Sequence, residues 1–117
     1  MRNKENIVFI KHILDSINAI EDFSKGMSRK ELSSNRMKQS AIVREIEVIG
    51  EAVKNISDNL KENYSSVPWK EIVGTRDKMI HHYFGVDLDI IWNIVKKDLP
   101  KLKLSMEKIE RELENKN

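Results

Sequence analysis

The sequence predicts an all-α protein, folded as an up-and-down bundle of four main helices with short accessory helices. Apolar residues recur at helical spacing along almost the whole chain, and no segment alternates with the period of a β-strand for long. Charged residues make up 34% of the chain and hydrophobic residues 39%, as in ordinary folded helical proteins. The length of 117 residues suits one domain with a modest core, so residues 1–117 are assigned to a single domain.

The first two helices are defined by their stop and start signals. The first runs over roughly residues 4 to 24, and Gly26 is a suitable residue to end it. "SRKE", from Ser28 to Glu31, has the spacing of a capping box and predicts a short second helix. The apolar positions expected to be buried in the first helix are Ile7, Ile10, Leu14, Ile17 and Phe23.

A long helix is expected from about residue 35 to residue 56, with "NISDN" at its end. "ENYSSVP" then predicts a loop, and Pro68 is placed at the first position of a helix that reaches Phe84. The apolar stripe of the long helix consists of Ile42, Ile46, Ile49, Val53 and Ile56.

The C-terminal third continues with helical spacing. Gly85 ends the preceding helix, and Asp87 is a suitable N-cap for the helix that begins at Leu88. Pro100 lacks a backbone N–H, so it should divide the following helical stretch into two or kink it.

Composition excludes several classes of protein and site. The formal net charge is +2, so a nucleic acid would have to bind to a local patch. The absence of cysteine excludes disulfides and thiolate metal sites. The N-terminal residues do not resemble a signal peptide, and no apolar run is long enough to span a membrane. We therefore expect a cytoplasmic protein.

The segment "TRDKMIHHYF" places an arginine on an apolar helix face. At about 100° per residue, Arg76 falls within the apolar arc that extends from Met79 and Ile72 through Trp69 to Val73. Burial of an unpaired guanidinium costs several kcal/mol, so this face is expected to line a cleft, an interface or an anion site. Tyr83 projects from the same face two turns later.

His81 lies on the flank of this helix, one turn beyond Asp77. This spacing would allow the carboxylate to hold the imidazole in one orientation. Each residue also has an ordinary explanation: a paired arginine, a surface Asp–His pair, or a core tyrosine. Their grouping within eight residues is what favours a functional site. On the preceding long helix, Arg44, Glu51 and Asn55 cluster opposite the apolar stripe, which favours a solvated face over a cleft border.

Arg76, His81 and Tyr83 spell R-x4-H-x-Y, which resembles the signature of HEPN-domain ribonucleases of the HepT-like toxin family. "AIVREIEVIGEAVKNIS" is similar to the long central helix of that family. "VPWKEIVGTRDKMIHHYFGVDLDIIWNIVKKDLPKLK" is similar to its C-terminal half. The resemblance covers nearly the whole chain. The chain departs from the family pattern only slightly, in Asp77, where relatives carry Asn or Asp, and in the additional His82.

The resemblance implies a toxin of a type II toxin–antitoxin pair, with a HEPN-like four-helix fold and a two-fold homodimer. Its activity would be metal-independent endonucleolytic cleavage of RNA, with no cofactor and no metal site. The implied partner is a minimal nucleotidyltransferase antitoxin, which in this family can transfer AMP from ATP to the tyrosine of the motif, here Tyr83.

The chemistry suits these residue types. Histidine titrates near neutral pH, so His81 is expected to transfer protons, and the Arg76 guanidinium to stabilise charge on the phosphate. Asp77 would support His81. The two motif residues lie about 140° apart on an ideal helix. Either a dimer in which one chain's arginine meets the other chain's histidine, or a loosening of the helix near Gly85, would bring them together.

Two other function classes are compatible with a helical protein of this size. A HEPN-like dimer could bind a nucleotide or a partner protein without cleaving RNA. A DNA-binding helical protein is disfavoured by the low net charge and by the lack of a basic recognition helix. The intact Arg76, His81 and Tyr83 favour the ribonuclease.

Overall fold

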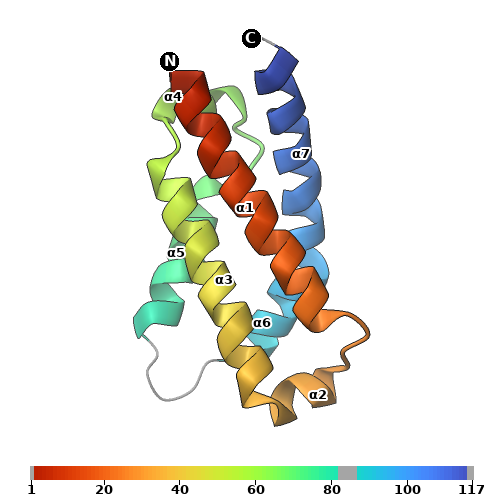
Figure 1. Ribbon diagram of the computed structural model, residues 1–117. Coiled ribbons are helices and arrows are strands. Elements are labelled where there is room, and N and C mark those ends of the chain that lie inside the picture. Colours follow the sequence, from red (N-terminus) through yellow and green to blue (C-terminus); the bar gives the residue numbers. More distant parts are fainter. Residues whose placement is uncertain (1, 82–86, 116–117) are drawn as a thin grey trace.

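The computed structural model describes the backbone of residues 2–81 and 87–115, and the side chains of residues 5–79 and 87–115 (Figure 1). Every regular element in these ranges is helical, which confirms the predicted all-α class. The longest helices are α1 (Arg2–Ser24), α3 (Arg36–Asn55), α5 (Trp69–His81) and α7 (Leu99–Asn115). They run alternately down and up, so the chain ends at the same end of the molecule as it begins (Figure 1).

Local capping interactions set the ends of the first helices as predicted. Gly26 has a φ of 69°, a left-handed conformation that glycine adopts without strain, and it follows the end of α1. The Ser28 hydroxyl accepts a 3.1 Å hydrogen bond from the Glu31 N–H at the start of α2 (Arg29–Ser34). Asn35 caps α3 in the same way, accepting a 3.0 Å bond from the Lys38 N–H.

The predicted loop over residues 62–68 is non-helical from Tyr64 onward, but a helix that the sequence did not predict lies between it and α3. A short helix, α4 (Asp58–Asn63), forms there, with Ser57 as its N-cap. The buried Asn6 of α1 fixes this cap: its amide donates to the Ser57 hydroxyl and its side-chain oxygen accepts from the Ser57 N–H, both at 3.0 Å. Residues of α1 therefore stabilise a helix that would be too short to persist alone.

Helix α5 begins one residue later than predicted. Pro68 precedes the helix, and its carbonyl accepts a 3.1 Å bond from the Ile72 N–H. The predicted helix end at Phe84 and the stop at Gly85 lie outside the described residues. Asp87 caps α6 (Leu88–Asn93) as predicted, because its carboxylate accepts bonds from the N–H groups of Asp89 and Ile90.

The α-helical stretch is divided just before Pro100, which is the second residue of α7, although the backbone stays helical throughout. Helical backbone continues from α6 through a π-helical segment, Ile94–Asp98, into α7. Proline has no backbone N–H, and the carbonyls that an N–H at position 100 would bond lie in the π-helical segment. The wider turn there accommodates the absence of this hydrogen bond. It also suits the spacing of Ile91, Val95 and Leu99, which are four residues apart and all buried.

Helix α3 lies at the centre of the packing. It contacts α1 on one side and α5 on the other, while α7 packs against α1. Within the described residues, α3 is the only helix against which α5 packs extensively. The predicted stripe of α3 is buried in full, whereas Ile7 and Phe23 of α1 are only partly buried at the edge of the core. No helix in the described ranges is long and apolar enough to cross a membrane.

Candidate active site

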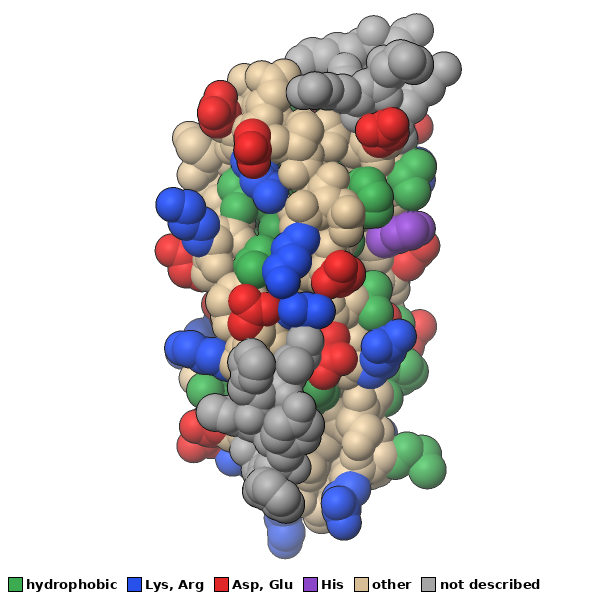
Figure 2. All heavy atoms as spheres, turned by 90° about the vertical axis from the view of Figure 1, so that its left-hand side faces the viewer, with side chains coloured by type: hydrophobic (Ala, Val, Ile, Leu, Met, Phe, Trp, Pro, Cys, Tyr) green, Lys and Arg blue, Asp and Glu red, His purple; other side chains and the backbone are tan. Residues whose placement is uncertain are grey.

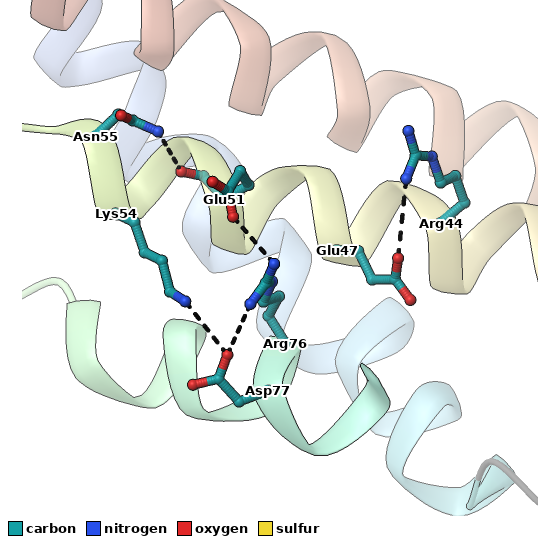
Figure 3. A network of polar contacts seen from close by, with 7 residues as sticks. All are labelled: Arg44, Glu47, Glu51, Lys54, Asn55, Arg76 and Asp77. Atoms are coloured by element: carbon teal, nitrogen blue, oxygen red, sulfur yellow. Dashed lines mark hydrogen bonds and ion pairs between the residues drawn. The ribbon is translucent and has the colours of Figure 1, made fainter. Parts of the chain in front are cut away.

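Arg76 lies in the second half of α5 and reaches across to α3 (Figure 3). One terminal nitrogen donates to the Glu51 carboxylate on α3 at 3.0 Å, and the other donates to the neighbouring Asp77 carboxylate, also at 3.0 Å. The ammonium group of Lys54 lies 3.5 Å from the same Asp77 oxygen. The arginine on the apolar face is therefore paired with carboxylates. This agrees with the ordinary explanation given for it in the sequence, that of a paired arginine.

These ion pairs remain accessible to solvent. The Arg76 side chain is 22% exposed, while Glu51 is 58% and Asp77 45% exposed. Exposed ion pairs contribute little to stability and exchange partners readily. The guanidinium is thus held in place, but it is not sealed away from a competing anion.

Gly50 on α3 determines how closely Arg76 can pack. A Cβ at position 50 would lie 2.3 Å from the Arg76 Cβ and 2.5 Å from its Cγ. The absence of a side chain at Gly50 lets the aliphatic part of Arg76 lie directly on the α3 backbone. The Nε of Arg76 is buried there, with no hydrogen-bond partner among the described residues.

The Asp77 carboxylate forms ion pairs with Arg76 and Lys54 in this arrangement. The hydrogen bond from Arg76 lowers the pKa of the Asp77 carboxyl below its usual value, and Lys54 adds to the effect. The carboxylate is therefore charged at neutral pH. Its predicted contact with His81 involves a side chain outside the described set and stays a prediction.

The structure places the other predicted site residues only in part. His81 is the last residue of α5, five positions after Arg76. The His81 side chain and the whole of Tyr83 lie outside the described part of the chain. Whether Arg76 and His81 converge is therefore not tested, and their catalytic roles remain predictions.

Arg76 lines an open depression of about 370 Å³ between α1, α3 and α5. Arg44, Glu51 and Asn55 line it too, although their side chains are also exposed. Figure 2 shows basic and acidic side chains interleaved on this side of the molecule, with apolar ones among them. The cluster on α3 thus borders the site, which is the alternative that the sequence disfavoured.

Two residues of the depression escaped the sequence analysis. Phe9 and His12 on α1 form its far side, and their rings meet edge to face with centroids 6.1 Å apart. Nothing in the local sequence distinguishes Phe9 and His12 from residues at the edge of the buried face of any helix. Only the packing of α1 against α3 brings them to the same hollow as Arg76.

A second hollow, of about 320 Å³, is lined by residues of α3, α5 and α7. Ile46, Ile49, Ile72 and Leu102 give it a mainly apolar lining. In the described residues, no group of three or more histidine or acidic side chains is placed to hold a metal ion.

The family to which the chain belongs follows from its sequence as a whole. The family model described as "Ribonuclease HepT-like" matches residues 13–109, which include α3, the Arg76 helix and most of α7. The chain belongs to the HepT-like ribonuclease family. The resemblance noted from the motif is therefore confirmed.

Individual relatives of this HepT-like chain agree. It is 40% identical over 107 residues to a protein of Methanocaldococcus jannaschii named as a "Putative RNase", covering 92% of this chain and 98% of that protein. It is 38% identical over 103 residues to a "Probable ribonuclease HepT" of Thermococcus cleftensis, covering 88% and 94%.

Another M. jannaschii relative, named "Gamma-glutamylcyclotransferase and putative RNase", is 44% identical over 115 residues. That match covers 97% of this chain but spans only 52% of the relative. No solved structure matches the chain.

Proposed function

We propose that this chain is the ribonuclease toxin of a type II toxin–antitoxin pair and cleaves RNA without a metal ion. The observation that carries the proposal is the position of Arg76 at an open depression, in a chain of the HepT-like ribonuclease family. The guanidinium is fixed by Gly50 and two carboxylates, yet it remains partly exposed. A donor group fixed in this way can stabilise a charged phosphate with little reorganisation.

In the proposed reaction, an RNA 2′-hydroxyl loses its proton and attacks the adjacent phosphorus. The bond to the 5′-oxygen breaks, and that oxygen receives a proton. The products are a 2′,3′-cyclic phosphate and a 5′-hydroxyl. His81 accepts the proton of the 2′-hydroxyl and gives it to the departing 5′-oxygen, since histidine titrates near neutral pH. Arg76 donates to the phosphate oxygens as they gain charge.

An anionic phosphate has to compete with carboxylates for Arg76. Only two of the five N–H groups of the guanidinium are bonded to Glu51 and Asp77. Because the Glu51 pair is exposed, phosphate can displace that carboxylate while Asp77 and Gly50 keep the arginine in place. The N–H group of Arg76 that was bonded to Glu51 then donates to the phosphate of the RNA.

Two copies of the chain complete the site in this proposal. The four long helices form a HEPN-like bundle, and a two-fold dimer brings the arginine of one copy to the histidine of the other. The packing of α5 supports this arrangement, because within the described residues α5 packs extensively only against α3. The exposed side chains of α5 among the described residues are then available to a second copy.

The partner proposed for the toxin is a minimal nucleotidyltransferase acting in the cytoplasm as the antitoxin. Transfer of AMP to Tyr83 would add a bulky, negatively charged group on the helix face that the sequence predicts for both Tyr83 and Arg76, where RNA phosphate is proposed to bind. Steric exclusion and charge repulsion would both block substrate binding. Mass spectrometry of the protein co-expressed with its antitoxin should locate AMP on Tyr83, and AMP found only elsewhere would overturn this step.

The test is cleavage of RNA by the purified protein in EDTA. Arg76→Ala and His81→Ala should each reduce the rate by at least about 100-fold, while light scattering still detects the dimer. Lys78→Ala is the matched control, since it removes an exposed cation from α5 without touching the depression. Loss of wild-type cleavage in EDTA, or full activity in both site variants, would refute the assignment.

A second candidate is a HEPN-like dimer that binds a nucleotide or a partner without cleaving RNA. The ion pairs of Arg76 with two carboxylates favour it, because a structural arginine would be satisfied in the same way. The two candidates differ in one result. A binding module leaves RNA intact, whether or not EDTA is present.

A further inference from the structure

The depression continues from Arg76 to a wall of two aromatic rings. Phe9 and His12 lie one turn apart on α1, with their ring planes at 88° to each other. The imidazole belongs to an exposed residue, while Phe9 is partly buried against the core. The proposed chemistry uses neither of them. An accessible imidazole backed by a second ring offers a flat surface on which another ring can stack.

The floor between this wall and Arg76 is apolar. Val48 and Ala52 come from successive turns of α3 and line the depression between α1 and α5. Neither side chain carries a polar group. A ligand that covers this floor therefore loses no hydrogen bond to it, which suits a flat and largely apolar body.

Polar groups form the rim. The Arg44 side chain is 74% exposed, and one of its terminal nitrogens lies 4.0 Å from the Glu47 carboxylate. So long a contact leaves the guanidinium available to another partner. The Asn55 amide nitrogen donates to the Glu51 carbonyl at 2.9 Å, which leaves its side-chain oxygen as an acceptor.

This combination does not fit a bare anion. Arg44 and Arg76 bring two positive charges to the rim, but Glu47 and Glu51 bring two negative charges. A ligand that fits must combine a flat ring for the wall and floor, polar edges for the rim, and an anionic group for an arginine. The volume of about 370 Å³ lies in the range of sites for small organic ligands.

We infer that the depression is a subsite for one unpaired nucleotide of the RNA, whose base stacks on the exposed His12 ring, beside Phe9 and above Val48 and Ala52. The nucleotide's phosphate then lies toward Arg76, next to the bond that is cleaved. This inference rests on the proposed ribonuclease function. A base in a duplex is stacked between its neighbours and cannot enter, so the substrate is single-stranded at this point.

The test separates binding from cleavage. The probe is a fluorescein-labelled, single-stranded oligoribonucleotide with every 2′-hydroxyl methylated, which the proposed reaction cannot cleave. Its Kd is measured by fluorescence anisotropy with the full-length protein. Loss of one stacking partner weakens binding by about tenfold, so His12→Ala should raise the Kd by that factor.

Two further variants show whether the ring itself is responsible. His12→Phe keeps a flat ring but cannot carry a charge, so it should restore most of the affinity. Asn18→Ala alters another exposed residue of α1 outside the depression and should leave the Kd unchanged. With cleavable RNA, His12→Ala should raise KM and leave kcat within about twofold, because a stacking contact acts equally before and during reaction.

Each outcome bears on the subsite and on the ribonuclease separately. A His12→Ala Kd equal to that of the wild type overturns the subsite, even if the wild type cleaves RNA. Failure of His12→Phe to restore affinity overturns stacking as its basis. A wild-type protein that binds the probe through His12 but cleaves no RNA supports the subsite and overturns the ribonuclease. A wild type that binds no probe overturns the subsite.

Discussion

Arg76 of α5 lies directly on the backbone of Gly50 of α3, so closely that a Cβ at position 50 would be 2.3 Å from the Arg76 Cβ. Two neighbouring residues of α3 therefore define the setting of the arginine. Gly50 admits its stem, and Glu51 binds its head at 3.0 Å. The glycine is needed for space, since it lies within a regular helix and its backbone is not strained.

Gly50→Ala should destabilise the protein, because the added methyl group forces α5 away from α3. Insertion of a methyl group into such a contact costs about 1–3 kcal/mol of unfolding free energy, measured by urea denaturation. The displacement of Arg76 should also slow RNA cleavage.

Gly74→Ala is the matched control for this substitution. Gly74 lies within α5, and a Cβ there would meet no atom within 4 Å. Alanine should therefore stabilise the helix, by up to about 1 kcal/mol. If Gly50→Ala proved as stable as Gly74→Ala, the close contact described for Arg76 would be wrong.

Glu51→Gln tests whether this carboxylate competes with RNA for Arg76. Asp77 and Gly50 still hold the arginine in the variant, while the negative charge beside the phosphate position is removed. We expect KM for RNA to fall several-fold, with kcat within about twofold of the wild type. Stability should change by less than about 1 kcal/mol, since the pair is exposed.

The control for Glu51→Gln is Glu45→Gln, which neutralises a carboxylate of the same helix that does not line the depression. It should leave KM unchanged. A large loss of kcat in Glu51→Gln, with KM unaltered, would mean instead that Glu51 positions Arg76 for catalysis.

Tyr64 should make stability depend on pH at the alkaline end. Partial burial and the hydrogen bond that its hydroxyl donates to Glu112 raise the pKa of Tyr64 from 10.0 to about 12. The protonated phenol is thus favoured by folding. The contribution of the Tyr64 hydroxyl to the free energy of unfolding is therefore complete below pH 10, and it is lost as the pH rises through about 12.

The measurement compares the unfolding free energy of wild type and Tyr64→Phe at a series of alkaline pH values. The difference between them should be constant up to about pH 10 and should shrink toward pH 12, where the folded protein also ionises. A difference that stayed constant through pH 12 would contradict the raised pKa.

Much of the fold could be predicted because its signals are local. Gly26, Ser28 and Asp87 each act on a backbone group within a few residues, and the structure confirms all three. Helix α4 was missed although Ser57 stands at its start. Its cap is held by Asn6, which is 51 residues away in sequence and could not be associated with it in advance.

The site was predictable in its centre and not in its surroundings. A helical projection picks out Arg76, because a charge on an apolar face has an immediate physical cost. Its partner Glu51 lies 25 residues earlier on another helix. His12 lies on a third helix, and only packing brings it to the depression. Such relationships depend on how helices are placed, which a periodic pattern does not encode.

The π-helical segment Ile94–Asp98 has a consequence for chain length. A π turn holds about one residue more than an α turn, so it is equivalent to a single-residue insertion in an otherwise regular helix. Deletion of one residue from this segment would restore a continuous α-helix and rotate the residues before it by about 100° relative to α7. Asp87 and helix α6 would then lie on a different side of α7. The direction in which α6 joins α7 therefore depends on the number of residues in this turn more than on their identity.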